Sequence, residues 1–203
     1  MSSVKARRGS FLLMTLAFVC ASAPPTSAHL VQTGFGTFYD GLAHFLITPT
    51  DVLAVLALGA LAGLRGASVA RPLLFVLSAA WLAGGIAGAV RPGGGELPLA
   101  SALSVALLGA LVAANARPPR ALVLALGGAA GLLHGYANGV TLTSFDPLRL
   151  TGAVVACFVF FTLAAGLVVG LRARWQEVAV RVAGSWIAAI GVLMIGWLAR
   201  DAR

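Results

Sequence analysis

Six apolar stretches follow one another along the chain, separated by short segments rich in proline, glycine and arginine. They cover residues 44–64, 72–90, 97–115, 120–138, 148–170 and 180–199. Each is close to the roughly 20 residues that a helix needs to cross a bilayer. None alternates with the period of a barrel strand, and lipid cannot satisfy free backbone groups, so a helix is expected in every stretch. The pattern predicts an all-α fold, a polytopic membrane bundle of about six transmembrane helices.

Prolines mark where several of these helices should begin. Pro72 follows Arg71, Pro98 follows Leu97, and Asp146-Pro147 has the order of an N-cap followed by a first-turn proline. Proline favours the first helical turn because its missing N–H has no partner there in any case. We therefore expect helix starts at these three positions.

Composition agrees with a lipid-embedded chain and excludes a soluble one. Hydrophobic residues make up 60% of the sequence, charged residues 10%, and the mean hydropathy is +0.97. Six acidic residues cannot cover the surface of a soluble domain of this size. The net charge of +8 would suit nucleic acid, but the basic residues form short clusters between apolar runs, with no basic face interleaved with aromatic side chains. The lipid bilayer is the predicted partner, and nucleic acid is not.

The first 28 residues have the composition of a secretory signal peptide. A basic segment at 5–8 precedes an apolar run at 11–21 that is too short to span comfortably, and Thr26-Ser27-Ala28 offers small residues for cleavage. Residues 1–28 are predicted to be removed, which leaves 29–203 as a single transmembrane bundle.

The distribution of arginine predicts the orientation. Seven arginines fall in one set of alternate loops: Arg65, Arg71, Arg117, Arg120, Arg172, Arg174 and Arg181. Four fall in the other: Arg91, Arg149, Arg200 and Arg203. The richer set should face the cytoplasm. The predicted location is therefore the bacterial inner membrane, with the mature N-terminus and the C-terminus on the periplasmic side.

With that orientation, all three histidines fall near the outer face. They are His29, His44 and His134, and Asp40, Asp51 and Asp146 lie on the same side. Chance would scatter three histidines over both ends of the bundle more often than not. Ionisable groups in a membrane segment mark functional sites, so a site open to the periplasm is expected.

His134 and Asn138 stand four residues apart, so they share a helix face about 6 Å apart along the axis. Imidazole nitrogen and amide oxygen are plausible co-ligands of a divalent transition metal. The alternative is a histidine bonded to a neighbouring carbonyl, with Asn138-Gly139 as a helix C-cap.

His44 and Asp51 are seven residues apart, which would separate them by about 10.5 Å on a continuous helix. Pro49 removes the backbone bond to Phe45, so a helix break is expected there and would bring the two closer. The alternative role of Asp51 is structural, because residues 48–51 also fit an N-cap, a first-turn proline and an acidic third residue.

Cleavage after Ala28 would give His29 a free α-amine beside its imidazole. This pair is a two-nitrogen chelate suited to nickel or copper. The alternative is an ordinary flexible tail.

These residues resemble the motifs of the HupE/UreJ membrane proteins. The family's H-P-x-x-G-x-D-H motif aligns with residues 44–51, and its H-G-x-A-H-G motif with 134–139. His44 and His134 match. Thr50 occupies the aspartate position of the first motif, Asp51 its second histidine, and Asn138 the last histidine of the second motif.

The resemblance implies a function in nickel or cobalt uptake that serves hydrogenase and urease. It implies a permease-like protein whose metal ligands are His29, His44, Asp51, His134 and Asn138, with the metal as substrate, no tightly bound cofactor, and metalloenzyme maturation proteins as partners. The second interpretation is an accessory or scaffold protein that binds metal or a partner at the outer face without transport. No enzyme is predicted, because the sequence has no nucleophile elbow, no H-E-x-x-H and no intramembrane carboxylate pair.

Overall fold

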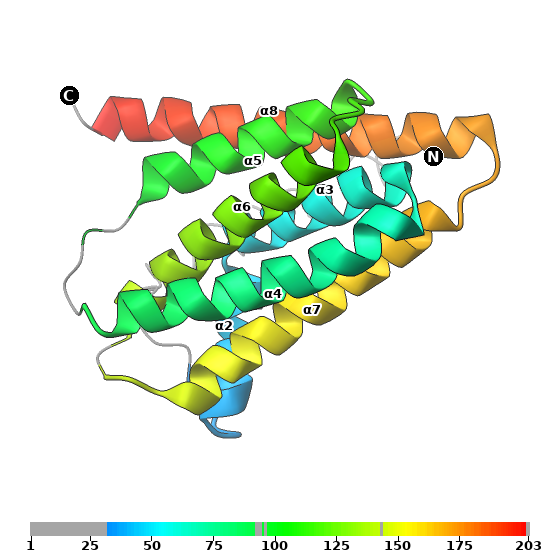
Figure 1. Cartoon of the computed structure of the whole chain (residues 1–203). Coiled ribbons are helices and arrows are strands. Elements are labelled where there is room, and N and C mark those ends of the chain that lie inside the picture. The colour runs from blue at the N-terminus through cyan, green and yellow to red at the C-terminus, as the bar shows by residue number, and fades with distance from the viewer. Residues whose placement is uncertain (1–31, 92–94, 96, 143, 202–203) are drawn as a thin grey trace, which may run out of the picture.

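The computed structural model describes residues 32–91, 95, 97–142 and 144–201, and these form seven α-helices with no strand. The helices are α2 (Thr37–Ile47), α3 (Pro49–Arg65), α4 (Ala67–Ala89), α5 (Pro98–Ala113), α6 (Arg120–Val140), α7 (Pro147–Val169) and α8 (Arg174–Asp201). The predicted all-α fold is confirmed (Figure 1). The predicted signal peptide and His29 lie outside the described residues.

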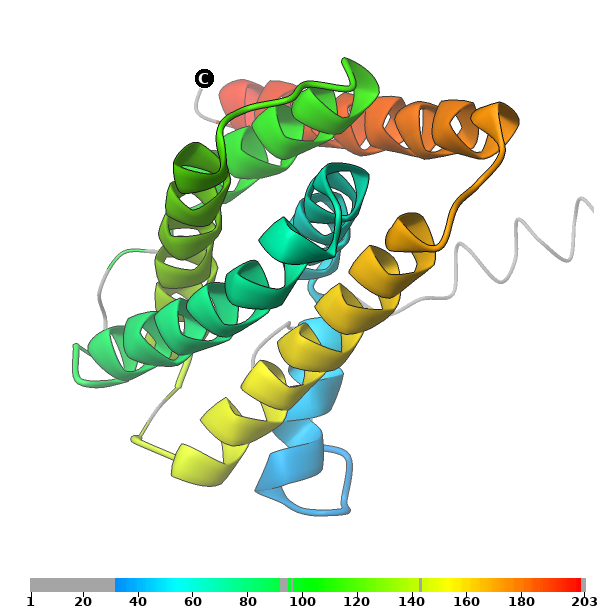
Figure 2. The same ribbon diagram turned by 45° about the vertical axis from the view of Figure 1, so that its right-hand side comes forward.

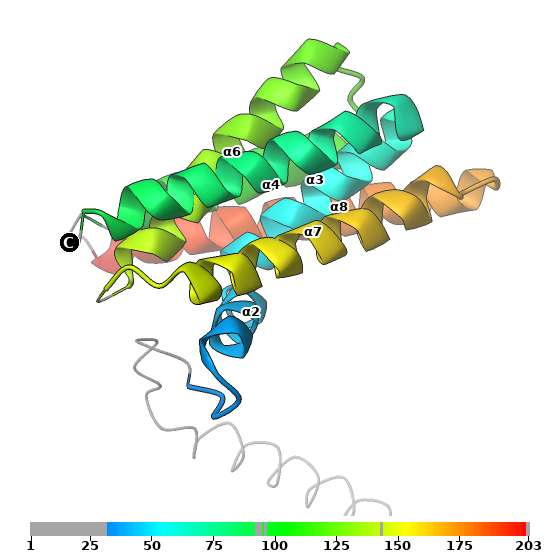
Figure 3. The same ribbon diagram turned by 60° about the horizontal axis from the view of Figure 1, so that its bottom comes forward.

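The first apolar stretch is broken where Pro49 predicts. The axes of α2 and α3 differ by 76°. Thr48 between them is extended, with φ −95° and ψ 96°, and its hydroxyl donates to the carbonyl of His44 at 2.7 Å. The missing N–H of Pro49 and this local bond together end α2. As a result, α2 leaves the group of long helices at an angle (Figure 3).

Two of the three helix starts predicted from proline are confirmed, and one is wrong. α5 and α7 begin at Pro98 and Pro147, and the carboxylate of Asp146 caps α7 by accepting from Leu148 N and Arg149 N at 3.0 and 3.1 Å. The expected start at Pro72 is wrong, because α4 begins at Ala67.

The early start of α4 has a packing reason. Pro72 is the sixth residue of α4 and cannot bond the carbonyl of Ser68. The helical turn before Pro72 buries Val69 and Ala70, which are 5% and 7% exposed. Apolar packing therefore overrides the proline signal.

Four helices are individually long and apolar enough to cross a membrane: α4, α6, α7 and α8. The bent pair α2 and α3 passes the same test together and makes a fifth candidate span. α5 has 16 residues, about 24 Å of helix, and falls short of a bilayer core of roughly 30 Å. The structure thus supports four or five spans, and the sixth stays a prediction.

α3 is the central helix of the bundle. It packs against each of the other described helices, and six of its residues are completely buried: Ala54, Val55, Ala57, Leu58, Leu61 and Ala62. The pairs α4–α6 and α5–α8, together with α7, surround it (Figure 2). A polar residue at the first turn of α3 is therefore carried into the middle of the fold.

α4 and α6 touch through their backbones. A Cβ added at Gly135 on α6 would collide with the carbonyl oxygen of Trp81 on α4, and one added at Gly84 with that of Leu132. Small residues allow such approach where lipid supplies no hydrophobic force between helices. The close contact brings Trp81 against His134, the neighbour of Gly135.

Candidate functional site

Asp51 is the centre of a buried polar network between α3 and α6. Its side chain sits in the first turn of α3 and the residue is 1% exposed. One carboxylate oxygen lies 2.8 Å from His134 Nδ1, and the other accepts from Asn138 Nδ2 at 2.6 Å. The predicted shared face of His134 and Asn138 is confirmed, because both reach the same carboxylate. Asp51 has the predicted position of a first-turn acid, but its carboxylate bonds α6.

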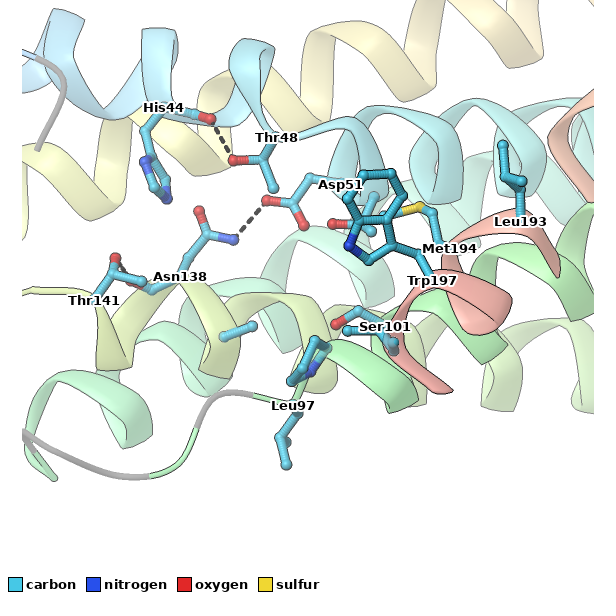
Figure 4. A pocket seen from close by; sticks show the side chains of 14 residues that line it. His44, Thr48, Asp51, Leu97, Ser101, Asn138, Thr141, Leu193, Met194 and Trp197 are labelled. Atoms are coloured by element: carbon cyan, nitrogen blue, oxygen red, sulfur yellow. Dashed lines mark hydrogen bonds between the residues drawn. The ribbon is translucent and has the colours of Figure 1, made fainter. Parts of the chain in front are cut away.

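The side-chain oxygen of Asn138 is buried and has no hydrogen-bond partner. Its Nδ2 donates to Asp51 and also to the carbonyl of His134, at 2.8 Å. The reversed amide would set its oxygen against two acceptors, so this orientation is fixed by chemistry. Oδ1 then points away from Asp51 toward the side of His44 (Figure 4), buried and without a hydrogen bond. A buried unsatisfied acceptor calls for a ligand or ordered water.

His134 lies behind Asp51 and is completely buried. Its Nε2 is 2.8 Å from the hydroxyl of Ser104, and its ring stacks on Trp81 with centroids 5.7 Å apart and planes 18° apart. Both ring nitrogens are thus bonded to side chains of other helices. The alternative of a C-cap at Asn138-Gly139 is wrong, because α6 continues to Val140.

A cavity of about 520 Å³ opens beside this network. One wall is polar and is formed by the α2–α3 break and the end of α6: His44, Thr48, Thr50, Asp51, Asn138 and Thr141. The facing wall is mostly apolar and comes from α5 and α8: Leu97, Pro98, Leu193, Met194, Trp197 and Leu198. Figure 4 shows Trp197 and Met194 on the opposite side of Asp51 from His44.

The structure brings together four of the five predicted ligands, since His134 contacts Asp51, and three of the four reach the cavity. His44, Asp51 and Asn138 line the cavity, whereas His134 is not among the lining residues. The carbonyl, imidazole and carboxylate donors form a mixed nitrogen and oxygen set of the kind that transition metals accept. Within the described ranges, no group of three or more His, Cys, Asp or Glu side chains is placed to hold a metal ion.

Asp40 forms a second buried carboxylate cluster next to the site. It accepts from Thr33 N and Thr33 Oγ1 at 2.6 and 2.7 Å, and its other oxygen lies 3.3 Å from Arg149 Nη2. Arg149 also borders a cavity of only about 10 Å³ that shares His44, Asn138 and Thr141 with the large one. Asp40 thus ties α2 to α7 at the edge of the site.

Several site residues were not predicted from the sequence. Ser101 and Ser104 are three apart on an otherwise apolar helix, a spacing that signals one polar face. Trp81 and Trp197 carry no such signal, because only the packing of α4 and α8 places Trp81 against His134 and Trp197 beside the cavity.

The fold and the site define a class: a polytopic α-helical membrane protein with a polar network and a cavity at one end of the bundle. The family model described as HupE / UreJ protein matches residues 16–194. The chain is also 30% identical over 175 residues to Protein HupE of Rhizobium leguminosarum bv. viciae, across 83% of this chain and 88% of that protein. No solved structure matches it. The chain belongs to the HupE/UreJ family, as its motifs indicate.

Proposed function

We propose that this chain is an inner-membrane, permease-like protein for a divalent transition metal of the nickel or cobalt type. The observation that carries the proposal is the buried Oδ1 of Asn138, which has no partner and lies beside a cavity that His44 and Asp51 also line. Membership of the HupE/UreJ family supports the same class of substrate.

We propose different roles for the predicted ligands. His44, Asn138 and Asp51 would contact the metal, since all three reach the cavity. His134 would orient Asp51 without contacting the metal, because its Nδ1 contacts Asp51 and its Nε2 contacts Ser104. A partner that orients a metal-binding carboxylate in this way affects affinity without touching the ion.

The site is proposed to open to the periplasm. The end of α6 and the last turns of α8, which border the cavity, lie at one end of the bundle, and the connections rich in arginine lie at the other (Figure 1). Seven arginines against four favour the second end as cytoplasmic. The metal would then enter from the outer side.

The Ser104, His134 and Asp51 side chains have the connectivity of a hydrolase triad, but they do not favour an enzyme. Ser104 lies in the middle of α5, where helical bonding engages the neighbouring N–H groups, so no oxyanion hole forms beside it. We therefore assign the three residues to holding Asp51 in place.

Uptake measurements test the proposal. Cells that produce the wild-type protein should accumulate more nickel than cells with the empty vector. In cells that produce His44→Ala, this excess should be about tenfold smaller. His44→Gln keeps much of the side-chain volume and serves as the packing control. Equal uptake by wild type and both variants would refute the assignment of His44.

The second candidate is a non-transporting accessory protein that binds metal, or a partner such as a maturation protein, at the outer face. It is favoured by the absence, within the described residues, of a group of three strong metal ligands. Proteoliposomes separate the two candidates. Nickel binding without flux into the vesicle lumen supports the accessory function, whereas flux that depends on His44 supports a permease.

A further inference from the structure

The cavity supplies too few donors to complete the coordination shell of a transition metal. Such ions take four to six ligands, of which an imidazole or an amide provides one and a carboxylate one or two. Among the described residues that line the cavity, the imidazole of His44, the carboxylate of Asp51 and the amide of Asn138 are the strong candidates. Both oxygens of Asp51 are already engaged by α6. At least half of an octahedral shell must come from elsewhere.

The cavity is also larger than a hydrated ion requires. Six waters occupy roughly 180 Å³ at the volume of liquid water. The volume of about 520 Å³ falls instead within the range of roughly 300–1,000 Å³ typical of sites for small organic molecules.

The two walls have opposite character. The facing wall consists of Leu193, Met194 and Trp197 of α8, together with Leu97, which precedes α5, and Pro98, the first residue of α5. An apolar wall gives a hydrated ion no hydrogen bonds and would cost it part of its hydration. It suits carbon atoms of an organic ligand. The guanidinium of Arg200 lies 5.2 Å from the ring centroid of Trp197.

We propose that the cavity takes the metal as a complex with a small organic chelator that carries amine, carboxylate or imidazole donors. The chelator supplies the missing ligands and lays its carbon skeleton on the α5–α8 wall. His44, Asn138 and Asp51 contact the metal ion of the complex. The inference rests on the proposed uptake function and specifies its substrate class.

Uptake at a fixed free-ion level tests this substrate. Nickel-63 is supplied to proteoliposomes with increasing L-histidine and total nickel, so that the 2:1 histidine–nickel complex rises while free Ni²⁺ stays constant. The expected rate rises with the complex until it saturates. A rate that depends on free Ni²⁺ alone overturns the chelate proposal and leaves the uptake function standing. No uptake in either form overturns both.

The apolar wall gives a matched pair of variants. Trp197→Ala should lower uptake of the complex by about tenfold, the effect of roughly 1.4 kcal/mol, and Trp197→Phe should restore most of it. Trp186→Ala is the control, because Trp186 is exposed on the same helix, 71% against 62% for Trp197, and does not line the cavity. Equal losses at both positions would point to a lipid-facing effect and overturn the assigned wall.

Discussion

Two buried carboxylates stand at the same end of the bundle, and their partners differ in kind. Asp40 faces Arg149, whose guanidinium is always charged, and two groups of Thr33. Asp51 faces an imidazole and an amide, neither of which brings a permanent positive charge. Because a buried carboxylate requires compensation, Asp40 has its counter-ion within the fold, whereas Asp51 can still accept one from outside. We therefore expect Asp40 to form a structural ion pair and Asp51 to belong to a cation site.

Neutralising Asp51 should have the largest effect on function. Asp51→Asn removes the negative charge beside the cavity, and nickel uptake should fall about 100-fold. The measurement is nickel-63 uptake normalised to the amount of folded protein in the membrane. Asp40→Asn is the matched control, since it makes the same substitution at the other buried carboxylate. Similar losses of nickel uptake in both variants would contradict the different roles proposed for the two carboxylates.

Neutralising Asp40 should instead act on stability. Asp40→Asn deprives Arg149 of its carboxylate in a nearly buried setting, where the two side chains are 9% and 13% exposed. The free energy of unfolding should fall by about 2 kcal/mol. Thermal unfolding in detergent checks it. A wild-type melting temperature for this variant would mean that the ion pair contributes nothing to the fold.

Replacing the amide by imidazole should strengthen the site. Asn138→His places a borderline nitrogen donor at the wall of the cavity, and affinity for nickel should rise about tenfold. Equilibrium binding to the purified protein measures the change. Asn138→Leu, which removes both the oxygen and the bond to Asp51, should lower affinity. If the histidine variant binds more weakly than the leucine variant, Asn138 does not face the metal.

Removing the hydroxyl behind His134 should have the smallest effect. Ser104→Ala leaves Nε2 of a completely buried imidazole without its partner and should cost about 1 kcal/mol of stability. Nickel affinity should fall only a few-fold, because His134 still contacts Asp51. Ser104→Thr keeps the hydroxyl and should restore both quantities. Failure of threonine to rescue affinity would assign Ser104 to packing alone.

Hydropathy and proline placement predicted much of the fold. The break at Pro49 and the cap at Asp146 follow from local backbone chemistry and are confirmed. The start of α4 does not follow from such chemistry, because the burial of Val69 and Ala70 decides it. α5 is one turn or more shorter than an ordinary span, a boundary that sequence patterns seldom resolve.

The candidate site was predictable as far as spacing and topology reach. A four-residue spacing placed His134 and Asn138 on one face, and alternating loops brought them to the same side as His44 and Asp51. That Asp51 would meet α6, 83 and 87 residues away, depends on helix register, which the packing of the whole bundle determines. The roles of Trp81, Ser104 and Trp197 depend on the same register.

Metal content of the purified protein tests the central claim most directly. Wild type, Asp51→Asn and Asp40→Asn are each incubated with nickel, supplied both as the free ion and with two equivalents of L-histidine, and then freed of unbound metal. Wild type and Asp40→Asn should retain about one nickel per chain in at least one of the two conditions, and Asp51→Asn should retain almost none. Equal retention by Asp51→Asn and wild type would contradict a cation site at Asp51.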